Sequence, residues 1–142
     1  MTWPREFEHR LRDWNALRDR VRELDQISAL RLINQWWWRA PWCAMSLCWQ
    51  DQDSWPDPWI LLSKDGFCDL ARALGMSYTV IMLPGLDLTH SELRELAGRD
   101  IVSVSGERYI LNWSTDIVID MPVISGDPGR RVSLHQLKSR LN

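Results

Sequence analysis

The sequence predicts an α+β fold: an N-terminal long amphipathic helix or helix pair, a Trp/Pro-rich connector, short helices, and a small antiparallel sheet of three or four strands. Apolar residues recur every three or four positions from 7 to 30, which is the spacing of one helix face. In the second half, short β-branched runs alternate with turn residues, which favours a sheet. A length of 142 residues fits a single domain over 1–142, with a helical N-terminal arm at 1–39 and a flexible or helical tail at 125–142.

The composition excludes several classes of protein. Apolar residues make up 45% of the chain and charged residues 25%, both close to the average of soluble globular proteins. The chain has no apolar run of about 18 residues, so we expect no membrane-spanning helix. The charged N-terminus is unlike a secretory signal. With 17 basic and 19 acidic side chains the net charge is -2, which argues against a nucleic-acid partner.

The chain has three cysteines, Cys43, Cys48 and Cys68, and no second Cys/His pair complements the first two. An odd, low count is typical of reduced thiols in a cytosol-like compartment. A structural zinc site needs four ligands in paired spacing. We therefore expect no metal and no other cofactor.

The first forty residues are predicted to form one long helix or two helices. Thr2 could cap the start, and Glu6 and Arg10 are spaced as an i,i+4 ion pair on the outer face. A break at residues 25–28 is one of these two alternatives, since Asp25 or Ser28 could cap a second helix that ends before Pro41. The apolar stripe is typical of a helix packed on its own fold, which we favour, and also of a helix packed along a partner.

Tryptophan is over-represented, with ten residues against two Tyr and two Phe. Seven of the ten lie within 24 residues, namely Trp36, Trp37, Trp38, Trp42, Trp49, Trp55 and Trp59. Neighbours on a helix point about 100° apart, so three consecutive tryptophans cannot all face one core. Because Trp dominates the energetic centres of protein interfaces, we predict that these seven residues form an interface with other proteins. The alternative is that exposed Trp rings bind carbohydrates of a cell surface.

The middle of the chain is predicted to form two short helices and a strand. Asp57 has the position of a helix cap, with Pro58 as the first helical residue. Asp65 could cap a second helix that ends at Gly75. The continuous apolar run at 78–83 contains β-branched residues and is expected to be a buried strand.

The second half is predicted to contain one more helix, a meander and a basic tail. Thr89 and Glu92 have the spacing of a capping box, which predicts a helix that ends at Gly98. Three short strands are expected after it, at 101–104, 108–113 and 117–119. The tail from 130 onward has the pattern of a short basic amphipathic helix.

Cys68 is the strongest candidate for a catalytic residue. It opens a predicted helix, where the helix dipole favours a thiolate, and a Cys in that place before antiparallel strands resembles papain-like and transglutaminase-like enzymes. Those enzymes need a His beside the thiol, but His90 lies in the capping box and His135 in the tail. Asp69, next to Cys68 in the sequence, is expected to raise the thiol pKa, because a like charge disfavours the thiolate. We therefore predict no catalytic residue and a buried Cys68, with a Cys68-dependent hydrolase or transferase as the alternative.

Several blocks of the sequence resemble small Trp-rich virion structural proteins of tailed bacteriophages. The blocks are INQWW (33–37), APW (40–42), WPDPW (55–59) and CDLARALGMSYT (68–79), with a weaker echo in YILNW (109–113). The resemblance covers about residues 30 to 80. It implies a non-enzymatic role in particle assembly, in the tail, baseplate or neck, with other virion proteins or a second copy of the chain as partners. It also implies a location in the virion, after assembly in the host cytoplasm.

Overall fold

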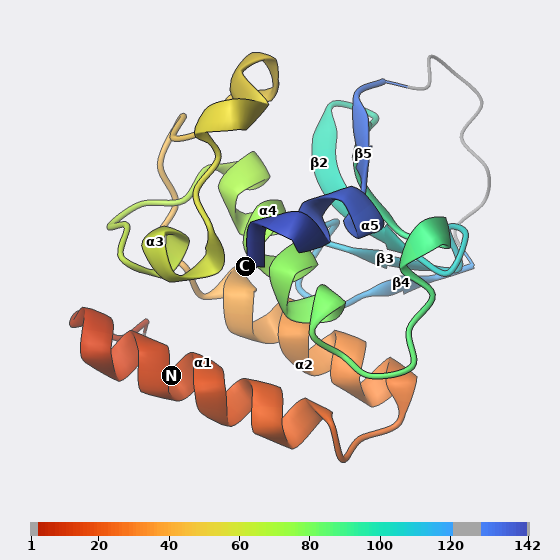
Figure 1. Ribbon diagram of the computed structural model, residues 1–142, viewed down its shortest axis with the longest axis horizontal. Helices are drawn as coiled ribbons and strands as arrows, with labels where there is room; N and C mark the ends of the chain where they lie inside the picture. The colour runs from red at the N-terminus through yellow and green to blue at the C-terminus, as the bar shows by residue number, and fades with distance from the viewer. Residues whose placement is uncertain (1–2, 121–128, 142) are drawn as a thin grey trace.

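The structure is a computed structural model that describes residues 3–120 and 129–141, and its architecture is α+β, as predicted (Figure 1). The α-helices are α1 (Phe7–Val21), α2 (Gln26–Trp38), α3 (Pro58–Leu62), α4 (Asp69–Ile81) and α5 (Leu134–Leu137). Short 3-10 helices lie at Trp49–Ser54, Leu88–His90 and Lys138–Leu141. The strands are β1 (Glu92–Leu96), β2 (Arg99–Val104), β3 (Tyr109–Leu111), β4 (Val118–Ile119) and β5 (Arg131–Ser133).

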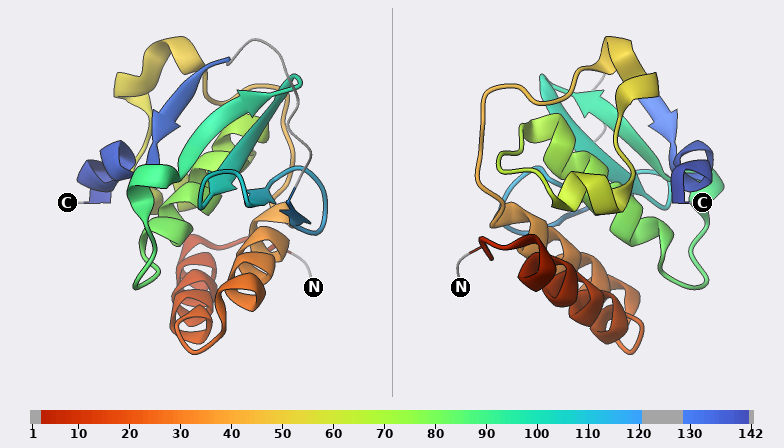
Figure 2. Two further views of the ribbon diagram at one scale, coloured as in Figure 1. Left: turned by 90° about the vertical axis from the view of Figure 1, so that its right-hand side faces the viewer. Right: turned by 60° about the vertical axis from the view of Figure 1, so that its left-hand side comes forward.

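The two N-terminal helices form an antiparallel pair on one side of the molecule, and the sheet lies on the other side (Figures 1 and 2). The break between them is where the sequence predicts it, because the Asp25 carboxylate accepts a hydrogen bond from the backbone N–H of Ser28. The start is different: α1 begins at Phe7 with Glu6 as its N-cap. The helix therefore starts later than predicted, and the predicted cap residue, Thr2, lies outside the described residues.

Helix α1 packs on its own fold rather than standing free for a partner helix. Its apolar stripe buries Trp14, Leu17 and Val21 in the core. The predicted surface pair between Glu6 and Arg10 does not form, because Arg10 is itself buried, with 3% of its surface exposed. Its guanidinium donates to four backbone carbonyls instead of to a carboxylate.

Helix α3 begins as the sequence predicts. The Asp57 carboxylate accepts a hydrogen bond of 2.8 Å from the backbone N–H of Ile60, and Pro58 occupies the first turn. The helix lies beside α4, at the left of Figure 1.

Helix α4 corrects two predictions. Residues 69–81 form one helix, so the predicted helix end at Gly75 and the predicted strand at 78–83 are both wrong. Every residue from Leu70 to Ile81 is buried, because α4 contacts α2, α3 and α5 as well as strands β1 and β2. A helix that is covered on all sides has no polar face, so its apolar residues run on continuously as in a buried strand.

Gly75 lies inside α4 because the ring of Trp37 on α2 packs directly against its backbone. A Cβ at Gly75 would lie 2.5 Å from two carbon atoms of that ring, well inside contact distance. The glycine therefore serves the close approach of two helices and does not end one.

The sheet is antiparallel, with five strands in the order β4-β3-β2-β1-β5, where three or four strands were expected. The helix predicted at 89–98 is wrong, because β1 lies there. Leu93 of β1 is buried between Val102 and Val132, its partners in the flanking strands. The chain then turns back at Ala97 and Gly98, which both have positive φ values (50° and 77°), as in a two-residue hairpin.

The C-terminal segment is partly as predicted. The described residues of the tail, 129–141, form β5, α5 and a 3-10 helix, and residues 125–128 and 142 lie outside the described residues. Leu134 and Leu137 of α5 are buried, and a capping box from Ser133 opens the helix. One continuous cluster of buried side chains includes residues from α1, α2, α3, α4, the sheet and α5.

Candidate interaction surface

Four of the seven predicted interface tryptophans are buried in the protein's own core. Trp36, Trp37, Trp49 and Trp55 each expose 7% or less of their surface. Their rings therefore have almost no area to offer a partner in this fold. The other three differ: Trp38 is half-buried, while Trp59 is 39% exposed and Trp42 is 68% exposed.

Each of the four buried rings has an acceptor for its indole N–H. Trp36 donates to Asp13 (2.8 Å), Trp37 to Thr79 (2.9 Å), Trp49 to Asp100 (2.8 Å) and Trp55 to the carbonyl of Cys48 (2.9 Å). A buried indole without such a partner would cost folding free energy. These acceptors come from four different parts of the chain, so the rings join elements that are distant in sequence.

The consecutive tryptophans of α2 separate as helix geometry requires. Trp37 points toward α4, where it meets Gly75. Trp36 lies toward α1, where it meets Asp13. Trp38 lies under the guanidinium of Arg72, 4.6 Å from the ring centre. The prediction that the three rings cannot all face one core is confirmed, and Trp38 packs on Arg72 of α4 in the same chain.

Among the described residues, most of the exposed large apolar side chains belong to α3, to the connector (residues 39–57, between α2 and α3) and to the start of α1. They are Phe7, Trp42, Met45, Trp59 and Ile60, with one further exposed residue, Ile119, in the sheet. The edge of the Trp59 ring meets Trp14 of α1 at 6.4 Å between centres, so this part of α3 leans on α1. Exposed Trp and Met side chains are typical of protein contact surfaces.

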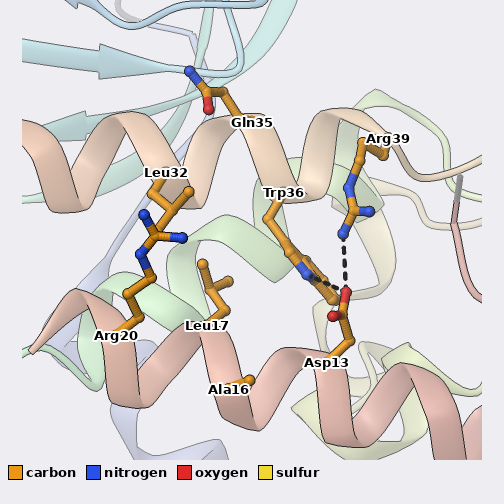
Figure 3. Close-up of a pocket in the computed structure, with 8 residues that line it drawn as sticks. All are labelled: Asp13, Ala16, Leu17, Arg20, Leu32, Gln35, Trp36 and Arg39. Carbon is orange, nitrogen blue, oxygen red and sulfur yellow. Dashed lines mark hydrogen bonds and ion pairs between the residues drawn. The ribbon is translucent and has the colours of Figure 1, made fainter. Parts of the chain in front are cut away.

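A groove of about 290 Å³ runs between α1 and α2. Figure 3 shows the eight residues that line it: Asp13, Ala16, Leu17, Arg20, Leu32, Gln35, Trp36 and Arg39. We call it the α1–α2 groove. Ala16 contributes only a methyl group to the α1 side of the groove. Its lining is mainly apolar, and its rim carries charges at both ends.

The two ends of the α1–α2 groove differ in charge. At one end the Asp13 carboxylate accepts hydrogen bonds from Trp36 (2.8 Å) and Arg39 (3.0 Å), so this carboxylate is neutralised within the fold. At the other end Arg20 points over the groove toward Leu32 (Figure 3). Arg20 has no ion pair with any residue in 3–120 or 129–141. The groove therefore has an apolar floor and one uncompensated positive charge.

Sequence reasoning missed the α1–α2 groove. One usable signal was present: a short link between two amphipathic helices places them side by side, and Ala16 is the smallest residue on the outer part of the first helix. The sequence also does not show which of the seven tryptophans are buried, because burial depends on contacts that are distant in sequence.

Cys68 is the N-cap residue of α4 and is buried, as predicted. The Ser46 hydroxyl donates to its Sγ at 3.3 Å. Burial alone would raise the pKa of Cys68, but this bond and nearby backbone N–H groups outweigh burial, and the pKa is lowered. Asp69 does not raise the thiol pKa as expected, because its carboxylate points to the sheet and accepts from the backbone N–H of Asp100 (2.7 Å).

The cavity at Cys68 has a volume of about 320 Å³ and lies between the connector and the start of α4. Its walls include Cys48, Trp49 and Asp100. Burial raises the pKa of Asp100, and the hydrogen bond from Trp49 opposes this rise. None of the three histidines (His9, His90 and His135) is among the described residues that line it. The nucleophile–histidine pair of papain-like and transglutaminase-like enzymes is therefore not assembled at Cys68.

Neither a metal site nor a membrane span is found in the described part of the chain. Within residues 3–120 and 129–141, no three or more His, Cys, Asp or Glu side chains gather as metal ligands. No helix in the same ranges has the length and apolar character needed to cross a bilayer. Comparison of the sequence with protein-family models and curated proteins, and of the chain with solved structures, finds no match.

Proposed function

We propose that this protein is a non-enzymatic assembly component of a tailed phage particle and binds another virion protein through the α1–α2 groove. The groove carries the proposal: it is an apolar depression with an unpaired cation, formed by two helices whose inner faces belong to the core. The resemblance of residues 30–80 to Trp-rich virion proteins supports the setting, in the tail, baseplate or neck. The site of action is then the virion, after assembly in the host cytoplasm.

The lining of the α1–α2 groove indicates the chemistry of the partner. Ala16 and Leu32 would contact an aliphatic or aromatic side chain, above a floor formed by Leu17 and Trp36, which expose only 5% and 7% of their surface. Arg20 would pair with a carboxylate one helical turn away from that side chain. An acidic amphipathic helix presents both groups, so we expect the partner to use such a helix.

A different virion protein fits the α1–α2 groove better than a second copy of this chain. An antiparallel contact between two α1 helices centred on Ala16 would place Arg12 of one copy opposite Arg20 of the other. The same register would place Asp13 opposite Asp19. Like charges facing each other across an interface oppose association.

Reversing the charge of Arg20 is expected to remove the protein from particles without unfolding it. The Arg20→Glu variant should reduce the particle-bound amount at least about tenfold, the effect of roughly 1.4 kcal/mol of lost binding free energy. The measurement is an immunoblot of particles purified on a density gradient after complementation of a gene-deleted phage. Circular dichroism would verify that the variant is folded.

Arg12→Glu is the matched control, because Arg12 is also exposed on α1 but does not line the groove. It should assemble like the unchanged protein. Equal incorporation of the Arg20 and Arg12 variants would show that the groove is not the contact. If the unchanged protein is itself missing from purified particles, the assignment to a virion is wrong.

A further inference from the structure

The connector passes over the N-terminal end of α4 and brings two cysteines to one cavity. Cys48 is exposed and Cys68 is buried, and both line the same space of about 320 Å³. The third cysteine, Cys43, does not line it; its side chain packs against Gly66. Two thiols of different exposure that share a cavity are the arrangement of a reactive and a resolving cysteine.

Distances restrict how far apart the two thiols can be. The Cys68 Sγ lies 4.0 Å from the carbonyl oxygen of Leu47. In a trans peptide that oxygen is about 2.8 Å from the next Cα, which belongs to Cys48. The Cys68 Sγ is therefore no more than about 7 Å from the Cys48 Cα, so the two residues are neighbours on the wall of the cavity.

The backbone is held in place on both sides of the cavity. The carbonyl of Cys48 accepts a hydrogen bond from the buried ring of Trp55 (2.9 Å). The backbone N–H of Cys68 donates to the Ser46 hydroxyl (3.4 Å), which also donates to the Cys68 Sγ. These contacts hold both chain segments beside the same cavity, so the two thiols stay neighbours in the folded protein.

We propose that a hydroperoxide oxidises Cys68 and that Cys48 then forms a disulfide with it, which ties the connector to α4. In the first step the Cys68 thiolate attacks the peroxide, an S–O bond forms, the O–O bond breaks, and the leaving hydroxide takes up the thiol proton as water. In the second step the Cys48 sulfur attacks the sulfenic acid, an S–S bond forms, the S–O bond breaks, and a second water leaves. Two thiols and one hydrogen peroxide thus give one disulfide and two waters.

The test treats the reduced, folded full chain with hydrogen peroxide, blocks remaining thiols with N-ethylmaleimide, and measures intact and peptide masses. We expect the loss of two hydrogens, blocking of Cys43 alone, and a cross-linked peptide that contains Cys48 and Cys68. The Cys43→Ser variant should form the same cross-link at the same rate. The Cys48→Ser variant should instead accumulate a Cys68 sulfenic acid that dimedone traps.

Three results would overturn the proposal. The first is blocking of all three thiols after peroxide treatment of the folded protein. The second is a cross-link that contains Cys43 in the unchanged protein. The third is dimedone labelling of Cys48→Ser that is no faster at Cys68 than at Cys43. A sample unfolded in guanidinium shows the unselective pattern for comparison, so a loss of fold cannot be mistaken for selectivity.

Discussion

Replacing Trp37 with alanine is expected to lower the free energy of unfolding by about 3–5 kcal/mol, the usual cost of deleting a large buried aromatic side chain. The ring is 1% exposed, lies against Gly75 and donates to the Thr79 hydroxyl. Trp14 donates to the same hydroxyl, so Thr79 accepts from two indoles at the centre of the core. The change would leave a cavity between α2 and α4, where neither helix can close it without moving.

Trp42→Ala is the matched control, because it deletes the same ring from a position that is 68% exposed. We expect its effect to stay within about 0.5 kcal/mol. Urea unfolding followed by circular dichroism measures both values. A loss at Trp42 equal to that at Trp37 would contradict the division of the tryptophans into core and surface.

Replacing Arg10 with methionine is expected to cost about 3 kcal/mol, although a charged residue is exchanged for an apolar one of similar length. The guanidinium donates to the carbonyls of Leu62 (2.7 Å) and Lys64 (2.8 Å), which belong to a segment more than 50 residues away. It also donates to Pro4 (3.0 Å) and Arg5 (3.1 Å). Methionine would leave these carbonyls without a donor, and buried acceptors without donors are costly.

Arg10→Lys separates charge from geometry in the same experiment. Lysine keeps the positive charge, but a single ammonium cannot reach four carbonyls in a planar fan, so its stability should lie between those of the methionine variant and the unchanged protein. Arg12→Met, on the exposed face of α1, should change stability by less than about 0.5 kcal/mol. Stability of Arg10→Met equal to that of Arg12→Met in urea unfolding would rule out the structural role of Arg10.

The elements that the sequence predicts correctly are those with a one-sided pattern or a strong local cap. Helix α1 has an apolar stripe with a polar opposite face, and Asp25 and Asp57 cap α2 and α3 as expected. Strands β2, β3 and β4 are short segments that contain β-branched or aromatic residues and lie between turns. In each case the deciding information lies within a few residues of the element itself.

The errors share one cause, because distant contacts override local signals. Residues 78–83 resemble a strand only because α4 is surrounded on all sides. The capping box at Thr89 is a genuine helix signal, but Leu93 gains more from burial between two neighbouring strands. A local sequence pattern cannot show either the helices and strands that surround α4 or the two strands that flank Leu93.

The same limit explains what could be predicted of the candidate surface. The clustering of tryptophan and the divergence of Trp36, Trp37 and Trp38 follow from sequence and helix geometry. Which ring is buried depends on distant partners. Trp37 packs against Gly75, 38 residues away in the chain, and Trp49 donates to Asp100, 51 residues away. The groove at Ala16 likewise exists only once α2 has packed beside α1.

Hydroxyl-radical footprinting of all ten tryptophans, read out by peptide mass spectrometry, tests the central claim most directly. That claim is that the tryptophan excess forms mainly the core and leaves the contact surface to the α1–α2 groove and a few exposed rings. We expect Trp42 to be oxidised fastest and Trp59 next, while Trp14 and Trp37 stay protected until the protein unfolds. Oxidation of Trp36, Trp37, Trp49 and Trp55 as fast as that of Trp42 in the folded protein would contradict it.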